Sequence, residues 1–442
     1  MKKIIVLFCI AALSLGLVLA DEGKSGWSWG GVPAVAYNSD NGFTYGIIVQ
    51  PFHYGDGSMY PDYLFSIYTE ISRTTKGGGI NTLFFDSKYL MPADIRVTAE
   101  LGLFTEQLLP FYGFNGAQSE YNELFEEQYL DDDETELNPD YKTRAYYRHA
   151  REQFRFTADF QKQILHPSLR GIAGIGFLNN TIGGIDLEKL NDGQDDADKL
   201  PAVAGLYDEY VAAGFIPSEE ADGGAANYLK LGLVYDTRDQ EANPMSGVWS
   251  EALFLTAPEF LGTETPYSQV TLTHRQYFTL IEKNLSFAYR LGYQGALGDQ
   301  PPFYMLPYYQ SSYKMQEGLG GSKSLRGILK NRIVGKSTYF ANFEMRWKFF
   351  RTVVGGQNLY LALNGFVDMG QVMEDYELDL VMLDRSMAVP PPGSDEDILH
   401  VAFGGGFRIA LNENFIVAID YGMAKDAQDG NSGMYIGLGY LF

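Results

Sequence analysis

The chain has 442 residues, a formal net charge of −23 at pH 7 and a single cysteine. This acidity argues against nucleic-acid binding, because nucleic-acid-binding domains present basic surfaces. The five histidines are scattered and no H-E-x-x-H motif occurs, so the sequence predicts neither a metal site nor a cofactor. Tyrosine (31), phenylalanine (29) and glycine (49) are abundant, which fits a secreted all-β protein or a transmembrane β-barrel.

Residues 1–20 have the pattern of a secretory signal peptide. Two lysines precede an apolar run, and Ala20 ends a small-residue cleavage site. Cys9 lies within that run, so cleavage would leave a chain that forms no disulfide. No later apolar run is long enough for a spanning helix. We therefore expect an exported protein with one domain, residues 21–442.

Segments in which apolar and polar residues alternate continue along this domain. In residues 337–350, for example, Met345 and Trp347 share an apolar face opposite Glu344 and Arg346. Sixteen such strands are expected, near residues 32–38, 43–53, 62–73, 78–89, 94–106, 145–160, 169–184, 227–237, 247–257, 267–280, 284–297, 337–350, 357–369, 399–411, 414–424 and 433–442. Their even number and long aromatic faces predict an all-β fold, a transmembrane antiparallel β-barrel of about 16 strands.

The four longest connections all fall on one side of such a barrel, at residues 107–144, 185–226, 299–336 and 371–398. Long extracellular loops and short periplasmic turns are the rule for outer-membrane barrels. The first, second and fourth connections carry net charges of −8, −9 and −7, against −23 for the whole chain. A solvated acidic surface is favoured over a dedicated calcium site, because the acidic runs lack EF-hand spacing.

Three stretches carry a family resemblance. They are LGLVYDTRDQEANPMSG from Leu231, GLGGSKSLRGILKNRIVGKSTYFANFEMRW from Gly318 and GFVDMG from Gly365, followed by YIGLGYLF at the C-terminus. Together they resemble the bacterial surface-antigen superfamily of outer-membrane barrels, which includes BamA and TamA. The resemblance covers about the C-terminal half of the chain. It implies a sixteen-strand barrel in the outer membrane of a Gram-negative cell, with one extracellular loop folded into the lumen.

The resemblance also implies that the arginine of this loop, Arg326, meets Asp368 on the barrel wall. The alternation independently puts Asp368 on the lumen face, where a guanidinium pairs well with a carboxylate. The implied site adds Gly320, Gly321 and Gly327 in the loop, and Glu344, Asp420 and Arg346 as further lumen partners. Arg326 would either gate the lumen or only stabilise the barrel, and the sequence favours neither.

Two other motifs are expected at the periplasmic end. Asp236, Arg238 and Asp239 are predicted to form a charged, hydrogen-bonded turn. Tyr440 and Phe442 continue the alternation of the last strand, which resembles the C-terminal signal of outer-membrane barrels. Phe442 is also expected to pair so that the barrel closes.

Members of the superfamily carry POTRA domains before the barrel, whereas the first strand predicted here leaves no room for one, so a barrel-only member is expected. The single G-x-S-x-G match, at Gly26, lacks the strand–turn–helix of a nucleophile elbow, and no enzyme is predicted. The resemblance implies that the protein assists insertion or translocation of proteins, or of lipids, with protein clients and membrane lipid as partners. A diffusion channel for small solutes and a surface interaction protein are the alternatives.

Overall fold

A computed structural model of the chain describes residues 25–38, 42–58, 63–87, 95–116, 119–130, 136–193, 195, 199–241, 243–354, 357–378, 397–411 and 415–442. The predicted signal peptide lies outside these residues. No helix within the described ranges is both long and apolar enough to cross a membrane.

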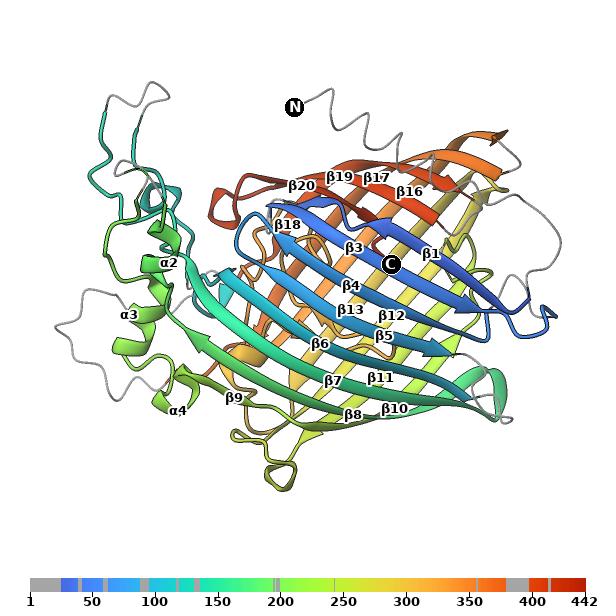
Figure 1. Cartoon of the computed structure of the whole chain (residues 1–442), viewed down its shortest axis with the longest axis horizontal. Coiled ribbons are helices and arrows are strands. Elements are labelled where there is room, and N and C mark those ends of the chain that lie inside the picture. The colour runs from blue at the N-terminus through green and yellow to red at the C-terminus, as the bar shows by residue number, and fades with distance from the viewer. Residues whose placement is uncertain are drawn as a thin grey trace.

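Sixteen antiparallel strands form one closed barrel, so the predicted fold is confirmed (Figure 1). The first and eighth strands each consist of two segments. In chain order the strands are β1 (Trp27–Pro33) with β2 (Ala36–Asn38), β3 (Gly42–His53), β4 (Phe65–Thr74), β5 (Gly79–Ser87), β6 (Ile95–Pro110), β7 (Arg148–Ile164), β8 (His166–Gly183), β9 (Gly223–Ala225) with β10 (Tyr228–Asp236), β11 (Gly247–Ala257), β12 (Tyr267–Ile281), β13 (Leu285–Ala296), β16 (Ser337–Val354), β17 (Gln357–Glu374), β18 (His400–Leu411), β19 (Phe415–Ala424) and β20 (Ser432–Leu438).

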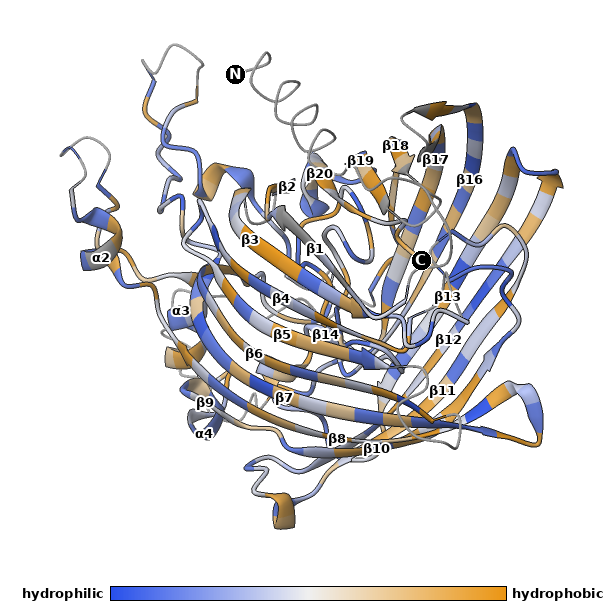
Figure 2. Cartoon of the chain, turned by 45° about the vertical axis from the view of Figure 1, so that its right-hand side comes forward, coloured by the Kyte–Doolittle hydropathy of each residue, from blue (hydrophilic) through white to orange (hydrophobic). Residues whose placement is uncertain are grey.

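Hydrophobic and hydrophilic residues alternate along the strands of the wall (Figure 2). Because successive side chains of a strand point to opposite faces, one set faces the lumen and the other faces the outside of the barrel. In β16, Met345 and Trp347 are exposed on the outside, whereas Glu344 and Arg346 are buried on the lumen side. This pattern places apolar side chains where lipid would contact the wall.

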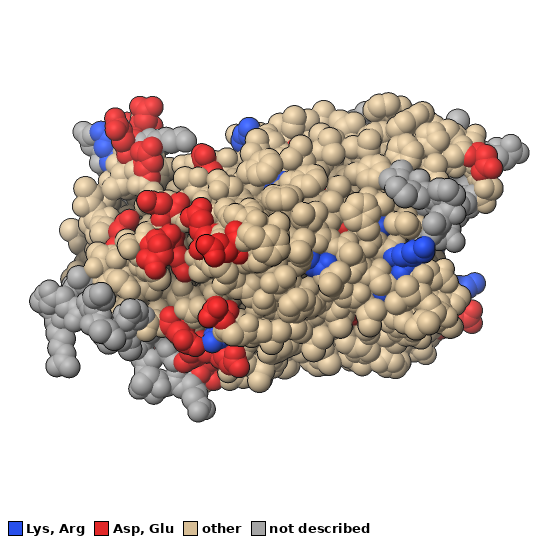
Figure 3. Space-filling model, turned by 90° about the horizontal axis from the view of Figure 1, so that it is seen from below, with Lys and Arg blue, Asp and Glu red and all other residues tan. Residues whose placement is uncertain are grey.

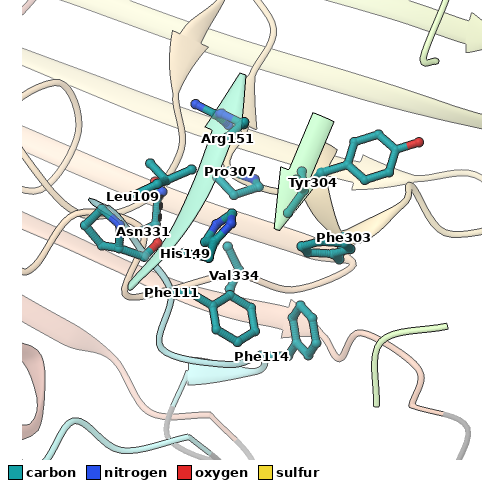
Figure 4. A pocket seen from close by; sticks show the side chains of 12 residues that line it. Leu109, Phe111, Phe114, His149, Arg151, Phe303, Tyr304, Pro307, Asn331 and Val334 are labelled. Atoms are coloured by element: carbon teal, nitrogen blue, oxygen red, sulfur yellow. Dashed lines mark hydrogen bonds between the residues drawn. The ribbon is translucent and has the colours of Figure 1, made fainter. Parts of the chain in front are cut away.

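One end of the barrel, here called the outer end, carries the long connections and the short helices α2 (Leu187–Asn191), α3 (Leu206–Ala212) and α4 (Ser218–Ala221) (Figure 1). Figure 3 shows acidic side chains gathered at this end, beside a wall that is largely uncharged on the face in view. Beneath the acidic surface, buried aromatic side chains from all four long connections pack together, among them Phe111, Tyr210, Phe303 and Tyr376. Figure 4 shows part of this cluster, which encloses a cavity of about 20 Å³.

The third long connection, residues 299–336, occupies the lumen and is called the plug loop. It contains one turn of 3₁₀ helix, η4 (Phe303–Met305), and a short hairpin of β14 (Tyr308–Tyr309) and β15 (Gln316–Glu317). Its polar contacts reach several parts of the wall. Lys230 of β10 donates to the Ser311 carbonyl at 2.9 Å, and the Ser312 amide donates to Glu251 of β11 at 2.8 Å.

The two ends of the barrel sequence differ from prediction. The first strand begins at Trp27 instead of near residue 32, so Trp27 and Trp29 lie in β1. The last strand ends at Leu438, because Gly439 adopts a left-handed conformation with φ +84° that breaks the pleat. Phe442 therefore does not continue the outward face. Its ring is buried against Tyr277 and Ala288.

Candidate functional site

Arg326 and Asp368 form the centre of the site, as the resemblance implied. The Nε atom of Arg326 lies 2.9 Å from Oδ2 of Asp368, and its second terminal nitrogen lies 3.1 Å from Oδ1. The backbone amide of Arg326 also donates to Oδ2, at 3.0 Å. Both side chains are almost completely buried, so this bidentate pair is shielded from water and joins the tip of the plug loop to β17.

The other predicted lumen partners lie around this pair. Arg326 also forms ion pairs with Glu344 of β16 at 2.7 Å and with Asp420 of β19 at 3.7 Å. Arg346 donates to the second oxygen of Glu344 at 2.7 Å, and Arg408 donates to Asp420 at 2.9 Å. Three arginines thus neutralise three carboxylates, which is the condition under which buried charges are tolerated. We call these six residues the lumen lock.

Glycines allow the loop tip to approach the wall. Gly320, Gly321 and Gly327 all have φ between +86° and +101°, a region that side chains disfavour. A Cβ on Gly327 would lie 2.6 Å from the backbone nitrogen of Met423 in β19. Only glycine therefore lets the residue after Arg326 lie directly against the wall.

The structure adds three contacts to the predicted site. Asn342 of β16 donates to Asp368 at 2.8 Å and to the Ser324 carbonyl at 2.6 Å. The guanidinium of Arg326 stacks over the ring of Phe366, 3.6 Å from its centroid. Asn342 and Phe366 are an even number of residues from Glu344 and Asp368, so alternation could have placed them on the lumen face. Their contacts with the loop depend on the tertiary structure.

The last strand contacts the same loop. The hydroxyl of Tyr435 in β20 accepts a hydrogen bond from the Gly327 amide at 3.1 Å. Among the residues that the structure describes, strand β20 closes the barrel against β2 through two residue pairs, Tyr37 with Ile436 and Asn38 with Tyr435. In the described chain β1 pairs with β3 alone, so its other edge makes no ladder with β20. We call this boundary the seam.

The C-terminal residues turn from the seam into the lumen. The Phe442 backbone oxygen accepts a hydrogen bond from Arg346 at 2.8 Å. The same guanidinium lies 4.4 Å from the ring centroid of Tyr440 and 4.9 Å from that of Phe442. Neither residue pairs with β2, so the expected strand pairing of Phe442 is wrong. The inward turn at Gly439 is the physical reason, and the sequence-signal role of these residues stays a prediction.

The DTRD motif forms a closed turn at the inner end, opposite the long connections. Asp236 accepts hydrogen bonds from the Arg238 amide at 3.1 Å and from its guanidinium at 2.9 Å. Asp239 accepts hydrogen bonds from the Met245 and Ser246 amides at 3.0 and 3.3 Å. Every one of these contacts lies within the turn, which is the arrangement of a structural motif.

Comparison with known proteins bears on the family and the fold of the chain. The model of the Omp85 superfamily domain matches residues 73–442. Among solved structures, BamA from Haemophilus ducreyi lacking POTRA domains 1-3 is similar at 15% identity and a TM-score of 0.54, over 94% of this chain and 71% of that one. CdiB from Escherichia coli is similar at 9% identity and a TM-score of 0.52, over 95% of this chain and 64% of that one. At these identities the two structures support the barrel fold alone.

Proposed function

Because the chain belongs to the Omp85 superfamily, we propose that it assists the insertion of proteins into the outer membrane or their translocation across it. The observation that carries this proposal is the short closure of the seam, which has two residue pairs between β2 and β20 within the described part of the chain. By contrast, β16 and β17 stay paired from Ser337 with Glu374 to Val354 with Gln357. Judged by the described residues, separating the seam strands would break two register pairs, whereas separating β19 from β20 would break seven.

The free edge of β1 supplies the chemistry that such a function needs. An unpaired strand edge presents backbone N–H and C=O groups that another strand can pair with. Between Trp27 and Pro33 this edge of β1 makes no ladder with β20, because β20 ends at Leu438. A client strand could therefore add to β1 before the barrel opens further.

The lumen lock would keep the route through the barrel closed while the seam strands separate and receive a client strand. Arg326 fixes the loop tip to three wall strands, β16, β17 and β19, through Glu344, Asp368 and Asp420. Removing the arginine leaves buried carboxylates without their shared partner, which favours release of the loop. Passage through the lumen would require the same rupture.

A cross-link across the seam tests the principal proposal. The variant Tyr37→Cys/Ile436→Cys joins register partners of β2 and β20. The matched control, Val367→Cys/Phe403→Cys, joins register partners of β17 and β18 within the continuous wall. In cells that lack the wild-type chain, oxidation of the seam variant should lower the levels of folded outer-membrane and exported proteins as strongly as deletion of the chain does. Reductant should restore these levels. The control variant should give wild-type levels. Normal protein levels with the seam fully oxidised would refute the proposal.

Planar-bilayer conductance tests the lock and separates it from the channel alternative. Wild type should be mostly closed and Arg326→Ala mostly open, at equal folding judged by heat-modifiability on gels. If both conduct steadily and alike, the lock does not gate, and a diffusion channel for small solutes becomes the better explanation. Deletion of the acidic outer connections would abolish a surface-interaction function and spare both of the others.

A further inference from the structure

A depression opens on the outside of the barrel, across strands β16 to β19. Its volume is about 590 Å³. Gly365 of β17 and Gly405 of β18 are register partners and lie side by side at its floor. A Cβ on Gly365 would meet no atom within 4 Å, so the floor is bare backbone that opens outward. Spacing of about 4.8 Å between strands makes the depression roughly 14 Å wide from β16 to β19.

The side chains around this floor are apolar or aromatic. They are Met345 and Trp347 of β16, Leu363 of β17, Phe407 of β18, and Ile419 and Tyr421 of β19. Trp347 and Tyr421, on opposite sides, are 51% and 49% exposed, so they rise above the glycine floor as walls. The polar residue at the edge, Asn364, turns its amide toward Asp420 in the lumen. Nothing charged lines the depression.

The paired strands and the apolar lining limit which class of ligand can bind in the depression. Each of the four strands is paired on both sides, so no backbone edge is free to receive a strand. The apolar lining offers no partner for a charged or strongly polar ligand. The depression is continuous with the lipid-facing surface, where exposed Val367 and Phe403 lie next to it on β17 and β18.

We propose that this depression is a binding site for one acyl chain of a membrane lipid. At Gly365 and Gly405 the wall has no outward side chain, and an unfilled depression would forfeit dispersion contacts with its lining. A flexible acyl chain along the glycine floor, between the Trp347 and Tyr421 rings, supplies the missing contacts. The site depends on neither the seam nor the lumen lock, so it stands apart from the proposed function.

Substitution of a glycine at the floor of the depression tests the proposal. Gly365→Leu fills the depression without a clash, because a Cβ there meets open space. Gly171→Leu is the matched control. Gly171 pairs with the exposed Leu233 on the far wall, and a Cβ there would make an ordinary 3.6 Å contact with Ile164. Both variants are first checked for heat-modifiability, so that unfolded barrels are excluded.

The measurement is photolabelling in vesicles of phosphatidylethanolamine and phosphatidylglycerol that contain a trace of phospholipid with a diazirine in mid-chain. Label on wild type should concentrate on peptides that carry Trp347 and Tyr421. Gly365→Leu should reduce it there to the level of the remaining lipid-facing strands, and Gly171→Leu should leave it unchanged. Even labelling around the wild-type barrel, or undiminished labelling in Gly365→Leu, would overturn the proposal. Cross-linking of Trp347 to a protein instead of a lipid in cell membranes would also overturn it.

Discussion

Two regions of the same barrel wall differ in the length of their strand pairing. Strands β16 to β19 pair over long ladders and carry the lumen lock, in which three arginines and three carboxylates neutralise one another. The seam pairs at two positions in the described chain, and its last strand turns inward at Gly439. From the lengths of the ladders we expect the β16–β19 side to resist separation more strongly than the seam.

Removal of the central arginine of the lumen lock should have the largest effect on the stability of the β16–β19 side. Arg326→Ala leaves Asp368 and Glu344 buried without their shared partner, and such a loss costs about 3–5 kcal/mol. Urea unfolding in lipid vesicles measures this loss. The exposed Arg351 provides the control, since Arg351→Ala should change the free energy of unfolding by less than about 1 kcal/mol. Equal effects of the two variants would show that the lock is not the stable side of the barrel.

The loop tip itself should be the next most sensitive position. Gly327→Val imposes φ +101° on a β-branched residue and brings its Cβ against the backbone of β19. Backbone strain of this kind costs about 1–3 kcal/mol, and relief of the clash should displace the loop tip. Hydrogen exchange of residues 318–334 should accelerate in this variant. Gly183→Val, where a Cβ meets no atom within 4 Å, should leave that exchange unchanged.

On the seam side, Gly439→Ala should weaken the inward turn. A left-handed conformation costs a residue with a Cβ about 1–2 kcal/mol, so the last residues should leave the lumen more often. Hydrogen exchange of the C-terminal peptide should accelerate, while the exchange of β16 and β17 stays as in wild type. Gly437→Ala is the control, because it meets open space without a positive φ. Unchanged exchange in Gly439→Ala would mean that Arg346 alone holds the turn.

The smallest expected effect is a pH dependence of stability at the outer part of the plug loop. Glu220 in α4 accepts hydrogen bonds from the Phe303 amide at 2.9 Å and from the Tyr376 hydroxyl at 3.3 Å. Burial raises the pKa of this carboxyl above its ordinary value. Since its pKa is higher in the folded than in the unfolded chain, its contribution to stability is present below the ordinary pKa and decreases as pH rises through the raised one.

Replacement of this carboxyl by an amide isolates the titration. Glu220→Gln keeps an acceptor for Phe303 but cannot ionise, so its unfolding midpoint should fall less than that of wild type as pH rises through this window. Glu219→Gln, at the exposed neighbouring position, should follow the wild-type profile. Parallel profiles for wild type and Glu220→Gln would contradict a raised pKa at this position.

Much of the barrel wall could be predicted because the alternation of apolar and polar residues along a strand shows which side chains share a face. Alternation in residues 337–350 correctly placed Glu344 and Arg346 in the lumen and Trp347 outside. The positions of the long connections followed from the spacing of the strands. The pairing of Arg326 with Asp368 came from family resemblance, and only the lumen-facing position of Asp368 followed from the residues themselves.

The sequence by itself determined the sixteen strands, their faces and the side of the long connections, because alternation and turn residues act between near neighbours. Only the tertiary structure decided which strand pairs are short, how three arginines share three carboxylates, and where Phe442 lies. The alternation runs through Gly439 unbroken and predicts Phe442 on the outside. Contacts with Arg346 and Tyr277, far away in sequence, combine with a left-handed conformation that glycine adopts at little cost, and they carry the C-terminal residues into the lumen.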